Sequence, residues 1–182
     1  MNHNEQMSTQ ELKATIREMV VVGKGILAAD ESAKTAAKRL ASINVESTEE
    51  TRRQYRNLIL NAPEMEKYIS GVILFEETLR QKSNDGVEFP KLLAKKGILP
   101  GIKVDEGLAD FNGSKEQYTK GLDSLSARLE EYKKFGTRFA KWRAVYSIRA
   151  IEDGTFFDET FSQKVSRTQL TEQLLVIRKM LE

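Results

Sequence analysis

Two cations interrupt an apolar stretch that has the character of a buried strand. Lys141 and Arg143 flank Trp142, and apolar residues precede and follow all three. Because successive side chains of a strand point to opposite faces, Lys141 and Arg143 are expected on one face and Trp142 on the other. Two buried cations destabilise a fold unless anions accompany them. The pattern therefore predicts either a pair of carboxylates or a bound anionic substrate beside these cations.

Two further apolar runs lead into ionisable side chains. Residues 25–29 are followed by Asp30, and residues 98–105 carry Lys103 and Asp105 on one expected face. In parallel α/β sheets and barrels, active sites are built at the C-terminal ends of the strands. The three runs therefore predict a charged site at that end of a parallel sheet.

The elements that must position these side chains alternate between strand and helix. Strands are predicted at about residues 21–29, 69–75, 98–105 and 138–146. Capping signals and apolar periodicity predict helices at about residues 8–20, 31–43, 47–60, 89–96, 121–135 and 167–181. This order favours βαβ units and a parallel sheet, either as half of an eight-stranded barrel or as a small doubly wound sheet. No Gly-x-Gly-x-x-Gly sequence follows the first predicted strand, which weighs against the second.

Composition excludes several kinds of chemistry. The chain has 182 residues, a net charge of +2, no cysteine and a single histidine, His3. Thiolate zinc sites, cysteine nucleophiles and histidine-based metal sites are therefore not expected, and neither is a cofactor. Nucleic-acid and membrane partners are not expected either, because the charge is small and no apolar run is long enough to span a bilayer. The first residues lack a signal-peptide pattern, so a cytoplasmic protein is expected.

Four motifs, in this order, resemble class I fructose-bisphosphate aldolase, the Schiff-base type. They are GILAADES (residues 25–32), GVILFEET (residues 71–78), GIKVD (residues 101–105) and FAKWR (residues 139–143). The resemblance implies an α/β fold of the (β/α)₈ TIM barrel class. It also implies a lyase of glycolysis that cleaves fructose 1,6-bisphosphate into dihydroxyacetone phosphate and glyceraldehyde 3-phosphate. Two domains are expected. Residues 1–148 should contain about the first four β/α units, and residues 149–182 should form an unrelated helical tail.

The resemblance also implies roles for single residues. Asp30 matches an acid that assists C–C cleavage, and Lys141 matches a lysine that helps to form the imine. The positions implied to bind the sugar-phosphate substrate are Ser32, Thr35, Lys38, Arg39, Arg52, Lys103 and Arg143. Residues 33–35 depart from the small, glycine-containing stretch that is usual in the family.

The family's imine-forming lysine and a key glutamate lie on later strands, which this chain is expected to lack. The expectation is therefore an incomplete or inactive fragment of the enzyme. The alternatives are a non-enzymatic, self-associating fragment or an interaction module, and the expected partners include a second copy or a complementary C-terminal half. Structural alternatives also remain for single residues: Asp30 as a helix N-cap, Lys103 paired with Asp105, and the helix arginines on a solvated face.

Overall fold

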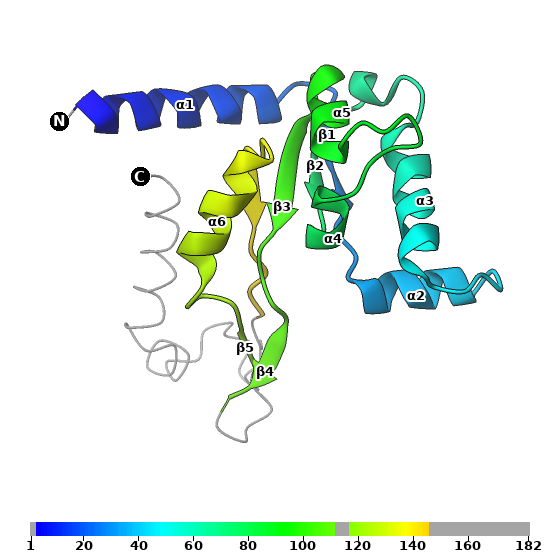
Figure 1. Cartoon of the computed structure of the whole chain (residues 1–182). Helices are drawn as coiled ribbons and strands as arrows, with labels where there is room; N and C mark the ends of the chain where they lie inside the picture. The colour runs from blue at the N-terminus through cyan, green and yellow to red at the C-terminus, as the bar shows by residue number, and fades with distance from the viewer. Residues whose placement is uncertain (1–2, 112–116, 146–182) are drawn as a thin grey trace, which may run out of the picture. The chain divides into compact units, whose positions relative to one another are not determined.

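The computed structural model describes residues 3–111 and 117–145 (Figure 1). The described part divides into two compact units, which we call the sheet unit and the hairpin unit. The sheet unit comprises residues 10–104 and 130–141, and the hairpin unit comprises residues 3–9, 105–111, 117–129 and 142–145. The tail expected at 149–182, with its helix at 167–181, lies outside the described residues.

The sheet unit contains a four-stranded parallel sheet in the order β1-β2-β3-β6. Its strands are β1 (Gly25–Ala29), β2 (Ile69–Leu74), β3 (Leu99–Lys103) and β6 (Phe139–Lys141). The predicted parallel sheet is thus confirmed, but the first and last strands were predicted too long. Before β1, Gly23 adopts a left-handed φ of 82° that turns the chain. Val22 is therefore fully exposed instead of lying in a strand.

The register of the sheet aligns the strand ends in rows. Ala29 pairs with Leu74, Leu74 with Ile102, and Lys103 with Lys141. Asp30 follows Ala29 and Lys103 follows Ile102, so Asp30, Lys103 and Lys141 form the next row. We call these three residues the charged row. Because side chains alternate between the two faces, this row projects from the face opposite Leu74 and Ile102.

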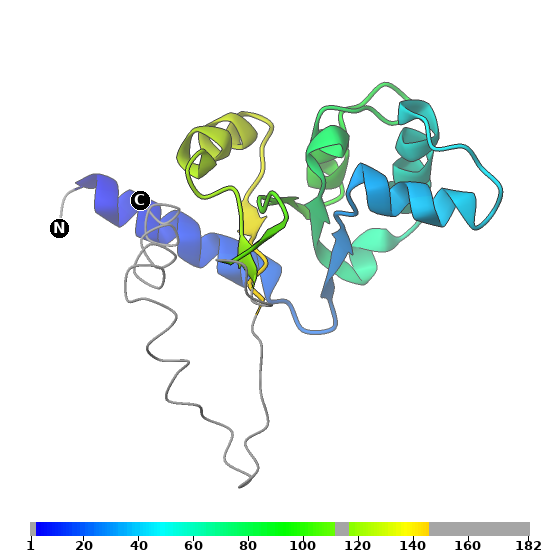
Figure 2. The same cartoon turned by 90° about the horizontal axis from the view of Figure 1, so that it is seen from below.

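Helices cover the face of the sheet that carries Leu74 and Ile102. The described helices are α1 (His3–Met19), α2 (Ala33–Ala41), α3 (Glu49–Leu60), η1 (Met65–Lys67), α4 (Glu76–Leu79), α5 (Phe89–Lys95) and α6 (Leu125–Lys134). Helix α2 contacts α3, and α4 and α5 contact each other and β3 (Figure 2). The core between sheet and helices contains Leu74 and Ile102 from the strands and Leu60, Leu79 and Leu93 from the helices, all almost fully buried.

Local signals explain where these helices begin. Thr48 caps α3 in a reciprocal capping box with Thr51, in which each side chain bonds the other's backbone amide. Pro90 lies in the first turn of α5, where its missing N–H costs nothing. Helix α1 begins at His3, about five residues earlier than predicted. No described helix is long and apolar enough to cross a membrane.

The hairpin unit contains two short strands that were not predicted. Strands β4 (Leu108–Asp110) and β5 (Gln117–Thr119) pair in antiparallel fashion. The rings of Phe111 and Tyr118 meet edge to face, with centroids 6.5 Å apart. Three residues per strand are too few to show an apolar alternation, so the sequence gives no strand signal here.

Candidate functional site

Asp30 and Lys141 form an ion pair between the two edges of the sheet. Asp30 directly follows β1, Lys141 ends β6, and Lys141 Nζ donates to Asp30 Oδ2 at 2.8 Å. Since neighbouring strands lie about 4.8 Å apart, a flat sheet would separate β1 from β6 by about 14 Å. The contact therefore requires the sheet to curl toward the face that carries these side chains. Both residues are only partly exposed, with 12% of the Asp30 side chain and 35% of the Lys141 side chain in contact with solvent.

Lys103 is the neighbour of Lys141 in the same row. The two residues are register partners on adjacent parallel strands, and both are half-buried. The ammonium groups of Lys103 and Lys141 and the Asp30 carboxylate thus lie at the C-terminal end of the sheet. Cations in a partly desolvated place are suited to holding an anion.

The Phe139 ring forms a floor beneath this row. It lies over Gly101 and Gly71, on the same face and one step back along the strands. A Cβ atom at Gly101 would overlap the ring, with Phe139 Cε1 only 2.6 Å away. A residue with any side chain at position 101 would have to displace either the ring or β6, the strand that carries Lys141.

The hairpin unit holds the second cation of the apolar stretch. Arg143 Nη2 lies 3.4 Å from Asp105 Oδ1, and the Asp105 side chain is fully buried. The Thr119 hydroxyl donates to the Arg143 carbonyl oxygen at 2.6 Å. Each of the two cations thus meets a carboxylate, the first of the two arrangements that the sequence predicts. Arg143 lies past the end of β6, however, so strand alternation does not place it on the face of Lys141 as expected.

The residues expected to hold a phosphate group lie mainly on α2. Ser32, and not Asp30, is the N-cap of this helix, so the alternative role of Asp30 as a cap is wrong. The Ser32 hydroxyl accepts from the Thr35 amide at 3.4 Å and lies 3.2 Å from the Thr35 hydroxyl. Lys38 is exposed. Arg39 is also largely exposed, forms an ion pair with Glu31, and donates to the Tyr55 hydroxyl at 2.9 Å.

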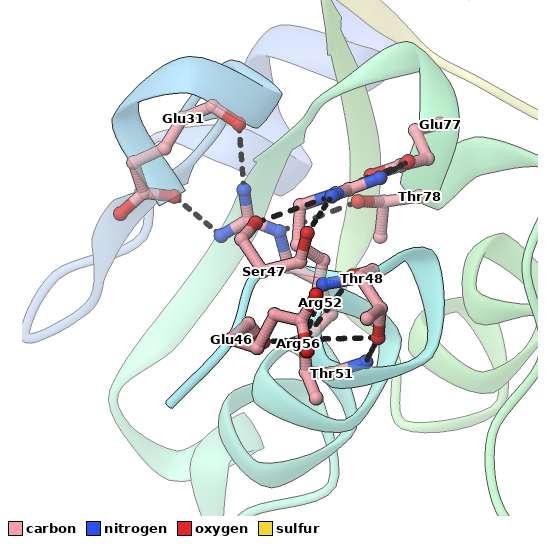
Figure 3. A network of polar contacts seen from close by, with 9 residues as sticks. All are labelled: Glu31, Glu46, Ser47, Thr48, Thr51, Arg52, Arg56, Glu77 and Thr78. Carbon is pink, nitrogen blue, oxygen red and sulfur yellow. Dashed lines mark hydrogen bonds and ion pairs between the residues drawn. The ribbon is translucent and has the colours of Figure 1, made fainter. Parts of the chain in front are cut away.

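Arg52 already has protein partners on most of its guanidinium. Figure 3 shows it between Glu77 and Ser47. Arg52 Nε donates to Glu77 Oε2 at 2.9 Å, Arg52 Nη2 donates to Glu77 Oε1 at 2.6 Å, and Arg52 Nη1 donates to Ser47 Oγ at 3.2 Å. These bonds join α3 to α4. A role for Arg52 in phosphate binding therefore remains a prediction.

The buried guanidinium of Arg56 was not among the site residues predicted from the sequence. Only 3% of this residue is exposed, and it lies one turn of α3 before the buried Leu60. Arg56 Nη2 donates to the main-chain carbonyl of Glu31 at 2.8 Å, Arg56 Nη1 forms an ion pair with the Glu31 carboxylate, and Arg56 Nε donates to Thr78 Oγ1 at 3.3 Å (Figure 3). Its spacing of four residues from Leu60 is the signal that places it on the buried side of the helix.

Glu31 is held as a carboxylate by this arrangement. Burial raises the pKa of its carboxyl. A bond to its own backbone amide and the charges of Arg56 and Arg39 lower this pKa by more than burial raises it, so the pKa lies below the ordinary value. Within residues 3–111 and 117–145, no three acidic or histidine side chains are grouped in a way that could hold a metal ion.

Comparison with known proteins links the chain to a family. The model of the family described as fructose-bisphosphate aldolase class-I matches residues 11–167. A probable fructose-bisphosphate aldolase class 1 of Xylella fastidiosa is 56% identical over 143 residues, which are 78% of this chain and 43% of the relative. The cytosolic fructose-bisphosphate aldolase 7 of Arabidopsis thaliana is 53% identical over 143 residues, 78% of this chain and 40% of the relative.

A solved structure gives the same result for the fold. It is a ternary co-crystal structure of fructose-bisphosphate aldolase from Plasmodium falciparum in complex with TRAP and a small molecule inhibitor. The similarity has a TM-score of 0.76 at 44% identity and covers 85% of this chain and 44% of that chain. The chain thus spans less than half the length of the relatives that it matches.

Proposed function

The chain belongs to the class I fructose-bisphosphate aldolase family, and from this we propose that it acts in the aldol cleavage of fructose 1,6-bisphosphate. The products are dihydroxyacetone phosphate and glyceraldehyde 3-phosphate. The observation that carries the proposal is the ion pair between Asp30 and Lys141, which brings together the two edges of the sheet at its C-terminal end. A site at this end of a parallel sheet is where such folds perform chemistry.

The side chains of the charged row suit the proposed chemistry. The substrate carries two phosphate groups, and Lys103 and Lys141 supply positive charge for an anion. Asp30 and Lys141 are 2.8 Å apart, within the distance over which a proton can pass between them. In the proposal, Asp30 accepts the proton of the substrate hydroxyl at C–C cleavage and Lys141 assists formation of the imine.

The cleavage is proposed for the fold once the imine-forming residue is supplied; for these 182 residues taken alone we propose binding of sugar phosphates without turnover. The motifs that match the family contribute an acid and several cations, and none of them contributes the residue implied to form the imine. On the phosphate side, Ser32 and Thr35 lie at the start of α2 and Arg39 lies in its last turn. These three residues are the proposed contacts, with Arg39 exchanging Glu31 for phosphate. A cytosolic location is proposed by analogy with the Arabidopsis relatives whose names state it.

Calorimetric titration of the full chain with fructose 1,6-bisphosphate tests the proposal. Binding should weaken about tenfold in Lys141→Met, because one charge-assisted contact is lost. The matched control is Lys91→Met on α5, an exposed lysine paired with Glu88, which should leave the affinity unchanged. Added salt should weaken binding in the wild type. A folded sample that does not bind the sugar phosphate would contradict the proposed function.

Two further experiments test the absence of turnover. Borohydride added with substrate should trap no covalent adduct, and an enzyme-coupled assay should detect no triose phosphate. A stoichiometric adduct would refute the binding-only proposal and would identify, by mass spectrometry, the lysine that reacted.

Self-association is a second proposed property of the chain. Within the described sheet, β1 has a neighbouring strand on one side only. Its Ile26 side chain is 45% exposed, and Ala28 beside it is exposed as well. An apolar strand edge of this kind is a template for further pairing. This observation favours a second copy, or a complementary piece of the fold, as a partner.

A further inference from the structure

We propose that Arg56 is a positioning residue that holds Asp30 in place for its contact with Lys141. Arg56 touches neither of them. It acts through Glu31, the residue that follows Asp30, from the helix-covered side of the sheet. The inference rests on the proposed function only because that function gives the Asp30–Lys141 ion pair its catalytic role.

The contacts of Arg56 fix both the backbone and the side chain of Glu31. One arm of the guanidinium donates to the Glu31 carbonyl oxygen at 2.8 Å, and the other forms an ion pair with the Glu31 carboxylate. The Nε–H donates to the Thr78 hydroxyl at 3.3 Å, which ties the guanidinium to α4. A planar fork with bonds in three directions leaves its acceptors little freedom to move.

Asp30 and Glu31 point to opposite sides of the chain, as their partners show. Asp30 meets Lys141, which belongs to the charged row, whereas Glu31 meets side chains from α2 and α3. Adjacent residues of an extended segment share one peptide plane, so a fixed Glu31 restricts the rotation that would carry Asp30 away from Lys141.

Burial makes this restraint strong. With 3% of Arg56 exposed, any movement of residues 30–32 that broke its bonds to Glu31 would leave a buried cation without its anion. Such a state is strongly disfavoured. A purely structural role for Arg56, as a link between α3 and the end of β1, would use the same bonds but would not require Lys141 to respond when they are lost.

Acylation of Lys141 separates the two roles. The Lys141 amine donates to the Asp30 carboxylate and only 35% of its side chain is exposed, so it is less accessible to an acylating reagent than a lysine amine that extends into solvent. The full-length chain would be treated with a short pulse of an acetylating reagent without sugar phosphate, and the rate at Lys141 read by peptide mass spectrometry. Lys91 serves as the internal reference in every sample.

Four variants define the expected result. Asp30→Asn should raise the rate at Lys141 about threefold or more, as expected for loss of a half-exposed pair. Arg56→Met should raise it by a comparable factor, and the double variant should show no more than Asp30→Asn alone. Arg53→Met is the matched control on the same helix, because Arg53 bonds Glu50 and Asn84 and not Glu31; it should leave the rate unchanged.

The outcomes that overturn the proposal are equally specific. If Arg56→Met lowers the melting temperature but leaves Lys141 reacting at the wild-type rate, Arg56 is structural only. Additive effects in the double variant would also refute a shared route through Asp30, and an unchanged rate in Asp30→Asn would refute the ion pair itself. If Arg56→Met does not fold, Arg56→Lys replaces it: it keeps the charge but not the fork, and it should give an intermediate rate, with the wild-type rate refuting the proposal.

Failure of the proposed function is recognised separately. A chain that does not bind fructose 1,6-bisphosphate but shows the expected acylation pattern would leave the positioning role of Arg56 intact. A chain that binds the sugar phosphate but shows no response of Lys141 to Arg56→Met would retain the function and lose the inference.

Discussion

The substitution Gly101→Ala should destabilise the sheet unit through a single steric conflict. A Cβ atom at this position would overlap the Phe139 ring, closer than side chains in proteins approach one another. An aromatic ring has few ways to yield, and Phe139 starts β6, so the conflict must move either the ring or the strand. The backbone itself tolerates alanine, since Gly101 does not have a left-handed φ.

Two other glycines of the same sheet give the scale. A Cβ atom at Gly71 would lie 3.1 Å from Phe139 Cε1, a tight but adjustable contact, and one at Gly25 would meet nothing within 4 Å. Overpacking of a buried site costs about 1–3 kcal/mol. Replacing glycine by alanine also stabilises by about 0.4–1 kcal/mol through the unfolded chain, wherever the folded backbone permits it. This second effect is common to all three variants, so their differences report the steric conflict.

The expected order of unfolding free energies is therefore Gly25→Ala above Gly71→Ala above Gly101→Ala. Urea denaturation followed by circular dichroism measures all three under one condition. Gly101→Ala should lie about 1–3 kcal/mol below Gly25→Ala, and the second substitution Phe139→Leu should recover part of the loss by opening space. Gly101→Ala and Gly25→Ala differing by less than about 0.5 kcal/mol would show that the ring does not lie over Gly101.

Two further predictions concern acid and assembly. The pKa of Glu31 is lowered in the folded state, so its stabilising contribution is complete above the ordinary value of 4.5 and is lost as the pH falls through the lowered value. Glu50, whose pKa is lowered to about 2 chiefly by its hydrogen bond to Arg53, acts in the same direction. Urea midpoints should therefore fall as the pH is lowered from about 5 toward 2, and less steeply in Glu31→Gln; an equally steep fall in that variant would contradict the role of Glu31. Sedimentation velocity at micromolar concentration should show dimers or larger species, reduced by Ile26→Lys on β1 but not by Ile43→Lys, which replaces an exposed isoleucine away from the sheet edge. A monomer in the wild type at that concentration would contradict self-association.

Local sequence patterns predicted much of the fold. The order of strands and helices, the capping of α3 at Thr48 and the start of α5 near Pro90 follow from periodicity and from signals a few residues long. The motifs around Asp30 and Lys141 also led to the family, which the comparisons confirmed. The exact strand ends and the short β4–β5 pair were missed, because turns and three-residue strands have little or no periodicity.

The sequence by itself determined that Lys141 needs an anion, because a cation within an apolar strand is costly whatever the fold. It could not determine which carboxylate meets it. Asp30 is 111 residues from Lys141 along the chain and three strands away across the sheet, and only the curl of that sheet brings the two to 2.8 Å. The same holds for Arg56 and Glu31, which are 25 residues apart and meet where α3 packs beside the end of β1. The local sequence states which residues carry charge. Which partner each charge meets depends on strand register, sheet curvature and helix packing, and these arise from many weak contacts distributed over the whole unit.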